Sequence, residues 1–534
     1  MIVSAFLSLA MTAPNRQLAF RRAVGMHVFL LTTLFLVLDR GSGPKSLTYV
    51  AYTILVMGIV EGAAMIGWRL TQMPKSQALE FLLVSPLQPR PVFFAEATVG
   101  ILRFGLVSLS GLPILICMWV SGFIMGADVV ALMLLPFTWG VLAGLGMTVW
   151  AYESRRIRRI GEWFMLGGIL VYLVVGVLAG ERLIHWLRAL PPSVGLFIFN
   201  GFRDFHHYNP FGVFQSMFDP NGVPWIAWER MIIAQFIALG IIVLLGLRGA
   251  FRLKGHYHDR HYTPIDSSRT DQVSLIGDHP LSWWAVRRVM EYSGRSNLWL
   301  AGGFCTLYAA YMLAGDQWPA WMGKSVFQIF EKMGGAPTLV TGMMLLAAMP
   351  AAFQYGLWDS STQDRCRRLE LLLLTDLRGV DYWRAACAAA IRRGRGYFYV
   401  AVILWIALAV SGQATIQQVI ASCAAGLMMW TFSFAIGFRA FASGVQANGL
   451  GSLLTLGLPF LTWALLRGNV PWLATILPPG SVYVALAYPL SWWWAIGPIL
   501  IGGITLAITR VALSSCESNL RLWYDRNQGT KTMG

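Results

Sequence analysis

Charged residues are scarce in this sequence. They account for 12% of its 534 residues, whereas hydrophobic residues account for 56%. Because a soluble domain is about one quarter charged, this composition excludes a soluble protein for most of the chain and favours one that lies largely in lipid. Acidic residues are scarcer still, at 25 against 41 lysines and arginines.

The excess of basic residues does not indicate nucleic-acid binding. If both termini lie in the cytoplasm, the cytoplasmic segments hold about 31 of the 41 basic residues and the outer loops about nine, which is the positive-inside bias of membrane proteins. One basic group, in a second cytoplasmic loop, is Arg155, Arg156, Arg158 and Arg159. We therefore expect no nucleic-acid partner, a multi-pass protein of the cell (inner) membrane, and cytoplasmic termini.

Several chemical motifs are missing as well. The six cysteines have neither the placement of an extracytoplasmic disulfide nor the spacing of a zinc site. No Ser/His/Asp or paired-carboxylate arrangement of a membrane enzyme is found. The nearest approach to a phosphate-binding P-loop is Gly323-Lys324-Ser325, but Trp318 stands where that motif needs glycine. The chain is therefore expected to hold no metal or cofactor and not to hydrolyse ATP itself.

What the sequence does contain is a series of long apolar windows, each suited to one helix across a bilayer core of about 30 Å. These windows are 23–38, 48–70, 104–127, 129–152, 163–180, 231–247, 296–315, 333–358 and 449–466. Window 396–438 fits two spans joined by a tight turn near Ser411–Gln418, and window 468–509 fits a loop and one span. The pattern predicts an all-α integral membrane protein with about twelve transmembrane helices.

The twelve predicted spans form two six-span halves, residues 1–250 and 283–534, joined by a polar cytoplasmic linker at 251–282. Because six is even, the two halves have the same orientation and form a parallel repeat. Each half ends with a Pro- and aromatic-rich outer loop before its sixth span, at 181–229 and 467–488. These loops are too apolar to lie in water, so we expect them to re-enter the outer half of the membrane.

The strongest internal similarity joins residues 78–103 to residues 368–393. At a constant offset of 290, eight positions are identical and Ser85 matches Thr375, where chance would give roughly two or three identities in a chain of this composition. The identical pairs are Leu79/Leu369, Glu80/Glu370, Leu82/Leu372, Leu83/Leu373, Leu87/Leu377, Ala95/Ala385, Ile101/Ile391 and Arg103/Arg393. This similarity indicates a duplicated unit with one copy in each half.

Each copy reads as a helix, an exposed turn and a second helix. Leucines recur at i, i+3, i+4 and i+8 from Leu79 and from Leu369, and the opposite face is apolar too, which requires a protein partner or the membrane interface. Ser85-Pro86 is typical of a helix start, and Thr375-Asp376 offers a cap followed by a first-turn acid. A single copy would fit an ordinary interfacial connector, but two matched copies favour a docking element.

With these residues in view, the chain resembles the permeases of type-2 ATP-binding-cassette (ABC) exporters. The resemblance rests on the pattern E-x-L-L-x-[ST]-P-L after the second span, on six spans per half and on the outer loop before the sixth. It is most specific over 79–103 and 369–393. It departs from the family in the fusion of two halves, which are more usually separate subunits, and in Asp376, where the family pattern has proline.

The resemblance implies two coupling segments that dock on cytosolic ABC ATPase subunits, which would carry the ATP and magnesium. The docking residues it implies are Glu80, Ser85, Pro86 and Leu87, and Glu370, Thr375, Asp376 and Leu377. The arginines from Arg155 to Arg159 would lie in a second loop that faces the ATPase.

Ionisable residues inside the predicted spans are few. Glu61 lies in the middle of the second span, where an acid is costly unless it is paired or faces water. It is a candidate for the substrate path, or it bonds a neighbouring helix or stays protonated. Its counterpart at the offset is Ala351. Arg103 and Arg393 stand at the start of the third spans and are expected to snorkel to the inner surface.

These observations together predict the permease subunit of an ATP-driven ABC exporter of unidentified substrate. The alternatives are an ATP-independent secondary transporter, which should carry several intramembrane ionisable residues, and a membrane-embedded enzyme, which should cluster polar residues at one membrane depth. Glu61 is nearly the only such residue that the sequence reveals, so the exporter is favoured.

Overall fold

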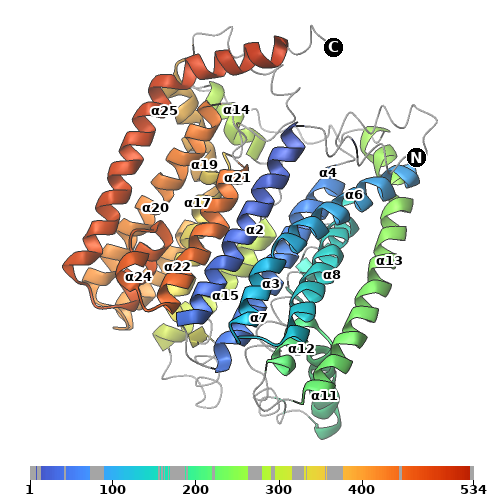
Figure 1. Cartoon of the computed structure of the whole chain (residues 1–534). Coiled ribbons are helices and arrows are strands. Elements are labelled where there is room, and N and C mark those ends of the chain that lie inside the picture. The colour runs from blue at the N-terminus through green and yellow to red at the C-terminus, as the bar shows by residue number, and fades with distance from the viewer. Residues whose placement is uncertain are drawn as a thin grey trace. The chain divides into compact units, whose positions relative to one another are not determined.

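The computed structural model describes residues 8, 14–40, 44–72, 89–153, 157, 160–161, 163–165, 167–168, 187, 191–218, 223–262, 280–289, 295–314, 330–331, 334–354, 357, 377–443 and 448–529. In this part of the chain every regular element is a helix (Figure 1). Nine segments among the described residues are long and apolar enough to cross a membrane. The chain is therefore an all-α, multi-pass membrane protein, as its composition predicts.

The chain divides into two compact units, Met1–Thr270 and Asp271–Gly534. The division falls within the predicted linker, but the linker is shorter than predicted. The last long helix of the first unit continues to Tyr262, and a new helix begins at Pro280. Residues 251–262 are therefore helical, because the polar sequence there still follows a helix without a proline or a cap to end it.

In the described part of the first unit, helices precede and follow a long membrane-crossing segment. Its elements are α2 (Pro14–Arg40), α3 (Pro44–Gly62), the π-helical turn η1 (Ala63–Gly67), α4 (Trp68–Gln72), α6 (Pro89–Ser110), α7 (Leu112–Val120), α8 (Gly126–Ala151), α11 (Pro192–His207), α12 (Pro210–Met217) and α13 (Pro224–Tyr262). The α3–η1–α4 run is one helix with a π-bulge in it, and α6 and α7 are one helix interrupted at Gly111, where Pro113 removes a backbone donor.

The second unit has a similar order of elements. These are α14 (Pro280–Val289), α15 (Arg295–Ala314), α17 (Gly335–Ala352), α19 (Gly379–Val410), α20 (Ile416–Ala442), α21 (Asn448–Ser452), η6 (Leu453–Gly457), α22 (Leu458–Arg467), α23 (Pro471–Ala474), α24 (Pro478–Ala487), η7 (Trp492–Ala495) and α25 (Ile496–Gly529).

The predicted spans agree with these helices in most places. Window 396–438 is two helices, α19 and α20, and the predicted tight turn between them occupies the five residues 411–415. The first window lies within α2, which is not among the nine most apolar segments, and window 296–315 matches the shorter apolar helix Leu298–Ala314. Window 163–180 lies mostly outside the described residues, so the count of twelve stays a prediction.

Helices of the two units begin and end at corresponding positions. The combined helix α6–α7 and helix α19 share their first and last residues at the offset of 290, and α8 and α20 share their first residue. After the outer loop, which is shorter in the second unit, α12 and α24 begin at an offset of 268, and so do α13 and η7. This agreement extends well beyond the residues that are identical in sequence.

The turn after the third span shows the agreement in detail. Gly122 has φ of 77° and Gly412 has φ of 70°, a left-handed conformation that glycine adopts without strain. Three residues later a backbone N–H is capped by a side chain in both turns: Met125 N donates to Asp128 Oδ2 over 2.9 Å, and Thr415 N donates to Gln418 Oε1 over 2.9 Å. Different side chains thus build one conformation.

Close backbone contact joins α3 to α8 in the first unit. A Cβ atom added to Gly62 would lie 2.2 Å from the carbonyl oxygen of Gly140, and one added to Gly144 would lie 2.8 Å from the carbonyl oxygen of Gly62. The Gly140–Gly144 pair is thus a helix-packing surface, as its spacing predicts, because only glycine lets two backbones approach so closely.

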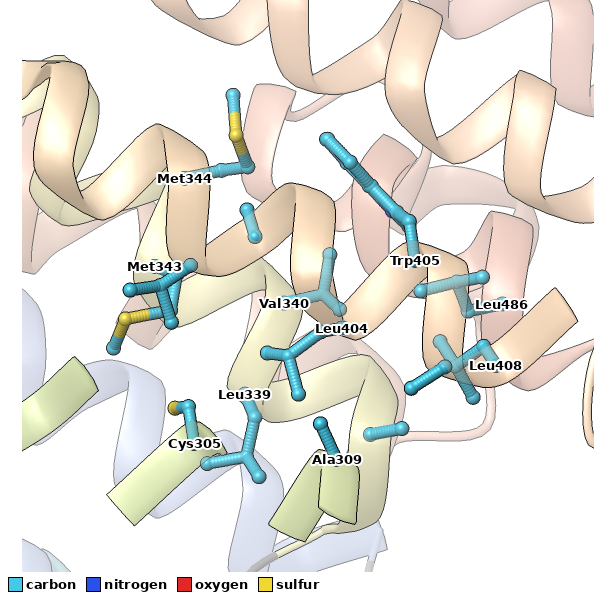
Figure 2. Packing of buried hydrophobic residues seen from close by; sticks show 14 of the residues in the cluster. Cys305, Ala309, Leu339, Val340, Met343, Met344, Leu404, Trp405, Leu408 and Leu486 are labelled. Carbon is cyan, nitrogen blue, oxygen red and sulfur yellow. The ribbon is translucent and has the colours of Figure 1, made fainter. Parts of the chain in front are cut away.

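The second unit has a large apolar core around α17 and α19 (Figure 2). Leu404 of α19 is fully buried near Leu339 and Val340 of α17, and Trp405 on the next position contacts α20. The Trp405 indole N–H donates to Ser422 Oγ of α20 over 3.1 Å, which satisfies the only polar atom of that ring. The core holds α15, α17, α19, α20 and α24 together.

Candidate functional site

Most of the predicted docking residues lie outside the described part of the chain. Those outside it are Glu80, Ser85, Pro86, Leu87, Glu370, Thr375, Asp376, Arg155, Arg156, Arg158 and Arg159. Leu377 is described: it is half-buried and packs on an apolar cluster of the second unit that includes Tyr382 and Phe441. The docking role of these residues stays a prediction. The candidate site consists of the described residues at the helix ends next to them and of the His27–Glu61 pair.

Helix α19 begins directly after the second predicted docking segment and is firmly anchored there. The Arg378 N–H donates to Asp381 Oδ2 over 3.0 Å, which caps the first turn. A Cβ atom on Gly379 would lie 2.7 Å from the carbonyl oxygen of Leu513, so the start of α19 lies directly against the backbone of α25.

Helix α6, which follows the first predicted docking segment, is anchored in the corresponding way. The Arg90 guanidinium carbon lies 4.0 Å from the centre of the Phe251 ring of α13, a cation–π contact. One turn later Phe93 is fully buried, and a Cβ atom on Gly249 of α13 would lie 2.5 Å from its ring. In each unit, the helix after the docking segment therefore packs at its first turns on the last long helix.

Two ion pairs and a tyrosine tie the helix ends of the first unit together. We call Arg69, Glu96, Tyr152, Glu153 and Arg248 the loop-end cluster. Arg69 Nε of α4 lies 2.6 Å from Glu96 Oε2 of α6, with only 23% and 11% of the two side chains exposed. The Tyr152 hydroxyl donates to the Leu70 carbonyl over 2.8 Å. Burial of either charge alone would be costly, so the pairing is needed where the helices meet.

The second ion pair of the loop-end cluster joins α8 to α13. Arg248 Nη2 lies 2.5 Å from Glu153 Oε1, and Arg248 Nη1 donates to the Val149 carbonyl over 3.2 Å. Arg252 Nε is a second, looser partner of Glu153 at 3.7 Å. Residues 73–88 follow α4 and the arginine-rich loop follows Glu153. The loop-end cluster therefore braces the helix ends from which both predicted ATPase-facing loops start.

Glu61 has a partner on the neighbouring helix. His27 Nδ1 of α2 lies 3.0 Å from Glu61 Oε1 and 2.9 Å from Glu61 Oε2 of α3. The two side chains are 8% and 15% exposed. A histidine with its proton on Nδ1 can donate to the carboxylate, and this satisfies an acid that would otherwise be costly inside a membrane. Of the alternatives open from sequence, the structure thus gives Glu61 a bond to a neighbouring helix.

The helices around the His27–Glu61 pair are irregular in the first unit, and in the second unit α17 ends at Ala352, next to the counterpart of Glu61. The π-bulge η1 begins two residues after Glu61, and a Cβ atom on Gly111, at the α6–α7 interruption, would lie 2.7 Å from His27 Nε2. At the corresponding positions of the second unit stand Ala351 and Ala401, and α19 runs without interruption. Among the described residues this polar pair is found in the first unit, and Gln317, the counterpart of His27 at the offset of 290, lies outside them.

Arg103 does not snorkel to the membrane surface as the sequence predicts. It is 8% exposed, lies in the middle of the 32-residue span Pro89–Val120, and its guanidinium carbon is 5.5 Å from the centre of the Phe20 ring of α2. The helix begins fifteen residues before its charge-free window and packs on α2, so the arginine side chain is enclosed by protein instead of extending to water.

The histidines before the predicted sixth span of the first unit have polar neighbours. His206 lies 2.6 Å from Gln215 Oε1 of α12, and Asp204 lies 3.4 Å from Arg203. Among the described residues, no group of three or more potential ligands is placed to hold a metal ion. The side chains of the linker histidines His256, His258 and His261 lie outside the described residues.

No protein-family model matches this chain, and no curated protein or solved structure matches it at a significant level. The candidate site therefore rests on the residues and contacts of the chain itself.

Sequence reasoning missed the partners in this site. It singled out Glu61 but not His27, and it did not connect Arg69 with Glu96 or Glu153 with Arg248. A signal was present for most of them, because His27, Glu61, Arg69, Glu153 and Arg248 are ionisable and lie in or at the edge of an apolar window, whereas Glu96 lies in the repeated segment 78–103. The positions that would face one another could not be read from windows that are apolar on all sides.

Proposed function

We propose that this chain is the permease subunit of an ATP-driven ABC transporter, working as an exporter in the cell (inner) membrane, with both termini in the cytoplasm. The proposal rests on the repeated segment, residues 78–103 and 368–393. Both copies contain a glutamate, a pair of leucines and a helix-start residue at an offset of 290. Two equivalent docking segments fit two copies of a cytosolic ATPase subunit, and this chain contains no P-loop of its own.

The arrangement of the helices supports a duplicated architecture. The bounds of α6–α7 and α19 correspond at the same offset as the docking segments, and the capped turns at Gly122 and Gly412 have the same conformation. A duplicated chain would thus offer each ATPase subunit the same helix, turn and helix.

The anchoring of α6 and α19 supports a route for coupling. Each helix starts where a docking segment ends and packs at its first turns on the last long helix of its unit. Interiors packed in this way move as blocks rather than deform continuously. ATP-driven closure of the ATPase subunits would displace the docking segments, and α6 with α13, and α19 with α25, would carry that displacement into the membrane.

The test is a co-purification experiment. The tagged chain, expressed in its native host, should co-purify with a P-loop ATPase identified by mass spectrometry, and the purified complex should hydrolyse ATP. Glu80→Arg with Glu370→Arg should abolish both. Glu517→Arg, on a side chain that is 49% exposed and outside both segments, is the matched control and should leave both intact.

Two outcomes would count against the proposal in different ways. If the ATPase still binds the Glu80→Arg/Glu370→Arg variant, the docking residues are wrongly assigned. If no ATPase accompanies the wild-type chain and ATP does not affect it, the chain is not an ABC permease.

The second candidate is a proton-coupled secondary transporter, which the His27–Glu61 pair favours. An ionisable pair inside a membrane bundle is a common element of proton relays. In that case, proteoliposomes that contain the chain alone should dissipate an imposed pH gradient, and Glu61→Gln should abolish this leak. A permease that depends on an ATPase should leave the gradient intact.

A further inference from the structure

Helix α11 exposes an apolar stripe that the rest of the first unit does not cover. Val194, Phe197, Phe205 and Tyr208 recur at helical spacing along one side, and the two phenylalanines are 81% and 60% exposed. The adjoining side of the helix is polar and carries Asn200, Arg203 and Asp204. The opposite side is packed: a Cβ atom on Gly195 would lie 3.0 Å from the carbonyl oxygen of Leu187.

The end of α11 is fixed to the membrane-crossing part of the unit. The chain reverses at Asn209, whose side chain accepts a hydrogen bond from the Gly212 N–H over 3.0 Å and caps α12. A Cβ atom on Gly212 would lie 1.7 Å from the His206 carbonyl oxygen, so α11 and α12 are in backbone contact. Helix α12 in turn packs on α3 and α13.

The apolar stripe of α11 adjoins a surface that faces lipid. In Figure 1, α11 lies at the end of α13 where that helix begins. The first turn of α13 exposes Trp225 (71%), and the helix continues with exposed Ile232 and Phe236. Only 22% of the most apolar window of this span is buried inside the protein, so most of this apolar surface is left to contact lipid in a membrane-spanning helix. A helix at the end of such a surface is at the depth of the lipid headgroups.

Basic side chains lie near the last turn of α11: Arg203, whose side chain is 49% exposed, and Arg230 of α13, which lies near His207. His207 has a pKa below its ordinary value, first because it is partly buried and then because Arg230 and Arg203 lie nearby, with Asp204 acting in the opposite direction. Basic side chains next to an apolar face are what an interfacial helix presents to lipid phosphates.

The second unit has no such helix. Its equivalent position holds only α23, the four residues Pro471–Ala474, before the corresponding backbone contact between Gly480 and Ala474. The fold of this region is thus complete without α11, which points to a separate role for the helix.

We propose that α11 is an interfacial helix that binds the lipid monolayer on the side of the membrane where α13 begins. Phe197 and Phe205 lie among the acyl chains, Asn200 and Asp204 face water, and Arg203 lies at the level of the headgroup phosphates. This proposal rests only on the multi-pass membrane fold and is independent of the proposed transport function.

The experiment uses a fluorophore at a single cysteine in the full-length chain. The six native cysteines are replaced, Phe197→Cys is labelled with bimane, and the protein is reconstituted into phosphatidylcholine vesicles. Lipids brominated on their acyl chains should quench the label about twofold or more, whereas aqueous iodide should have little effect. Asn200→Cys, on the polar side of the same helix turn, is the matched control and should give the reverse result.

Two results would overturn the proposal. Quenching of the Phe197→Cys label by iodide as strongly as that of the Asn200→Cys label would place the stripe in water. Protection of the label from both quenchers would show that protein, such as a second copy of the chain, covers the stripe. If Phe197→Cys does not fold, Val194→Cys on the same stripe gives the same comparison.

Discussion

Replacement of His27 by alanine isolates the physical role of the intramembrane pair. The change leaves the Glu61 carboxylate, whose side chain is only 15% exposed, without the imidazole that lies 2.9 Å away. Loss of a hydrogen bond to a buried charged group costs about 1.5–3 kcal/mol in soluble proteins, whereas bonds between membrane helices average about 0.6 kcal/mol. Between these two figures, we expect a loss of about 1–2 kcal/mol.

The measurement is thermal unfolding in lipid nanodiscs. For a folded unit of about this size, 1 kcal/mol corresponds to roughly 2–4 °C in Tm, so His27→Ala should lower Tm by about 2–8 °C. Glu61→Ala should also lower it. The double variant should lose less than the sum of the two, because it leaves neither side chain without its partner. Alanine is also tolerated at the position that corresponds to Glu61, since Ala351 stands there in α17.

A matched control pair is available on the surface of α25. Arg521 Nη2 and Glu517 Oε1 lie 3.2 Å apart with side chains 60% and 49% exposed. Their double-variant cycle should show little coupling, as is usual for exposed i,i+4 pairs. If the losses from His27→Ala and Glu61→Ala are simply additive, the two residues do not stabilise each other and the reasoning about this site is refuted.

Three further predictions concern packing, the loop-end cluster and pH. Gly62→Ala should lower Tm by several degrees through backbone overlap, whereas Gly146→Ala, which meets nothing within 4 Å, should leave it equal or higher; equal losses would contradict the close contact. Arg69→Glu should destabilise the chain and Arg69→Glu with Glu96→Arg should recover part of the loss in thermal unfolding, since the pair is buried. The pKa of His207 is lowered in the folded state, so the unfolded state takes up more protons and stability falls as the pH drops below about 6.5. His207→Gln should flatten the dependence of Tm on pH in that range, and an unchanged slope would rule this out.

The sequence alone was sufficient for the class of protein and for much of the helix pattern. The partition of a segment into lipid depends on its own composition and length, so a long apolar window specifies a membrane helix without knowledge of its neighbours. The turn between α19 and α20 was predictable for the same reason, because Gly412 and the Thr415–Gln418 cap act within a few residues. The docking segments are also a sequence inference, and they still await the co-purification test.

Only the tertiary structure decided which polar residues meet. His27 and Glu61 are 34 positions apart, and helices that are apolar on nearly every side give no periodic signal for the face they turn toward each other. Packing between helices decides which faces meet, as where Gly111 lies against Leu31 and His27 of α2. The same packing buries Arg103, which local sequence placed near the surface, and joins Arg69 to Glu96. Element identity thus follows from the chain itself, whereas the pairing of charges depends on how neighbouring helices fit together.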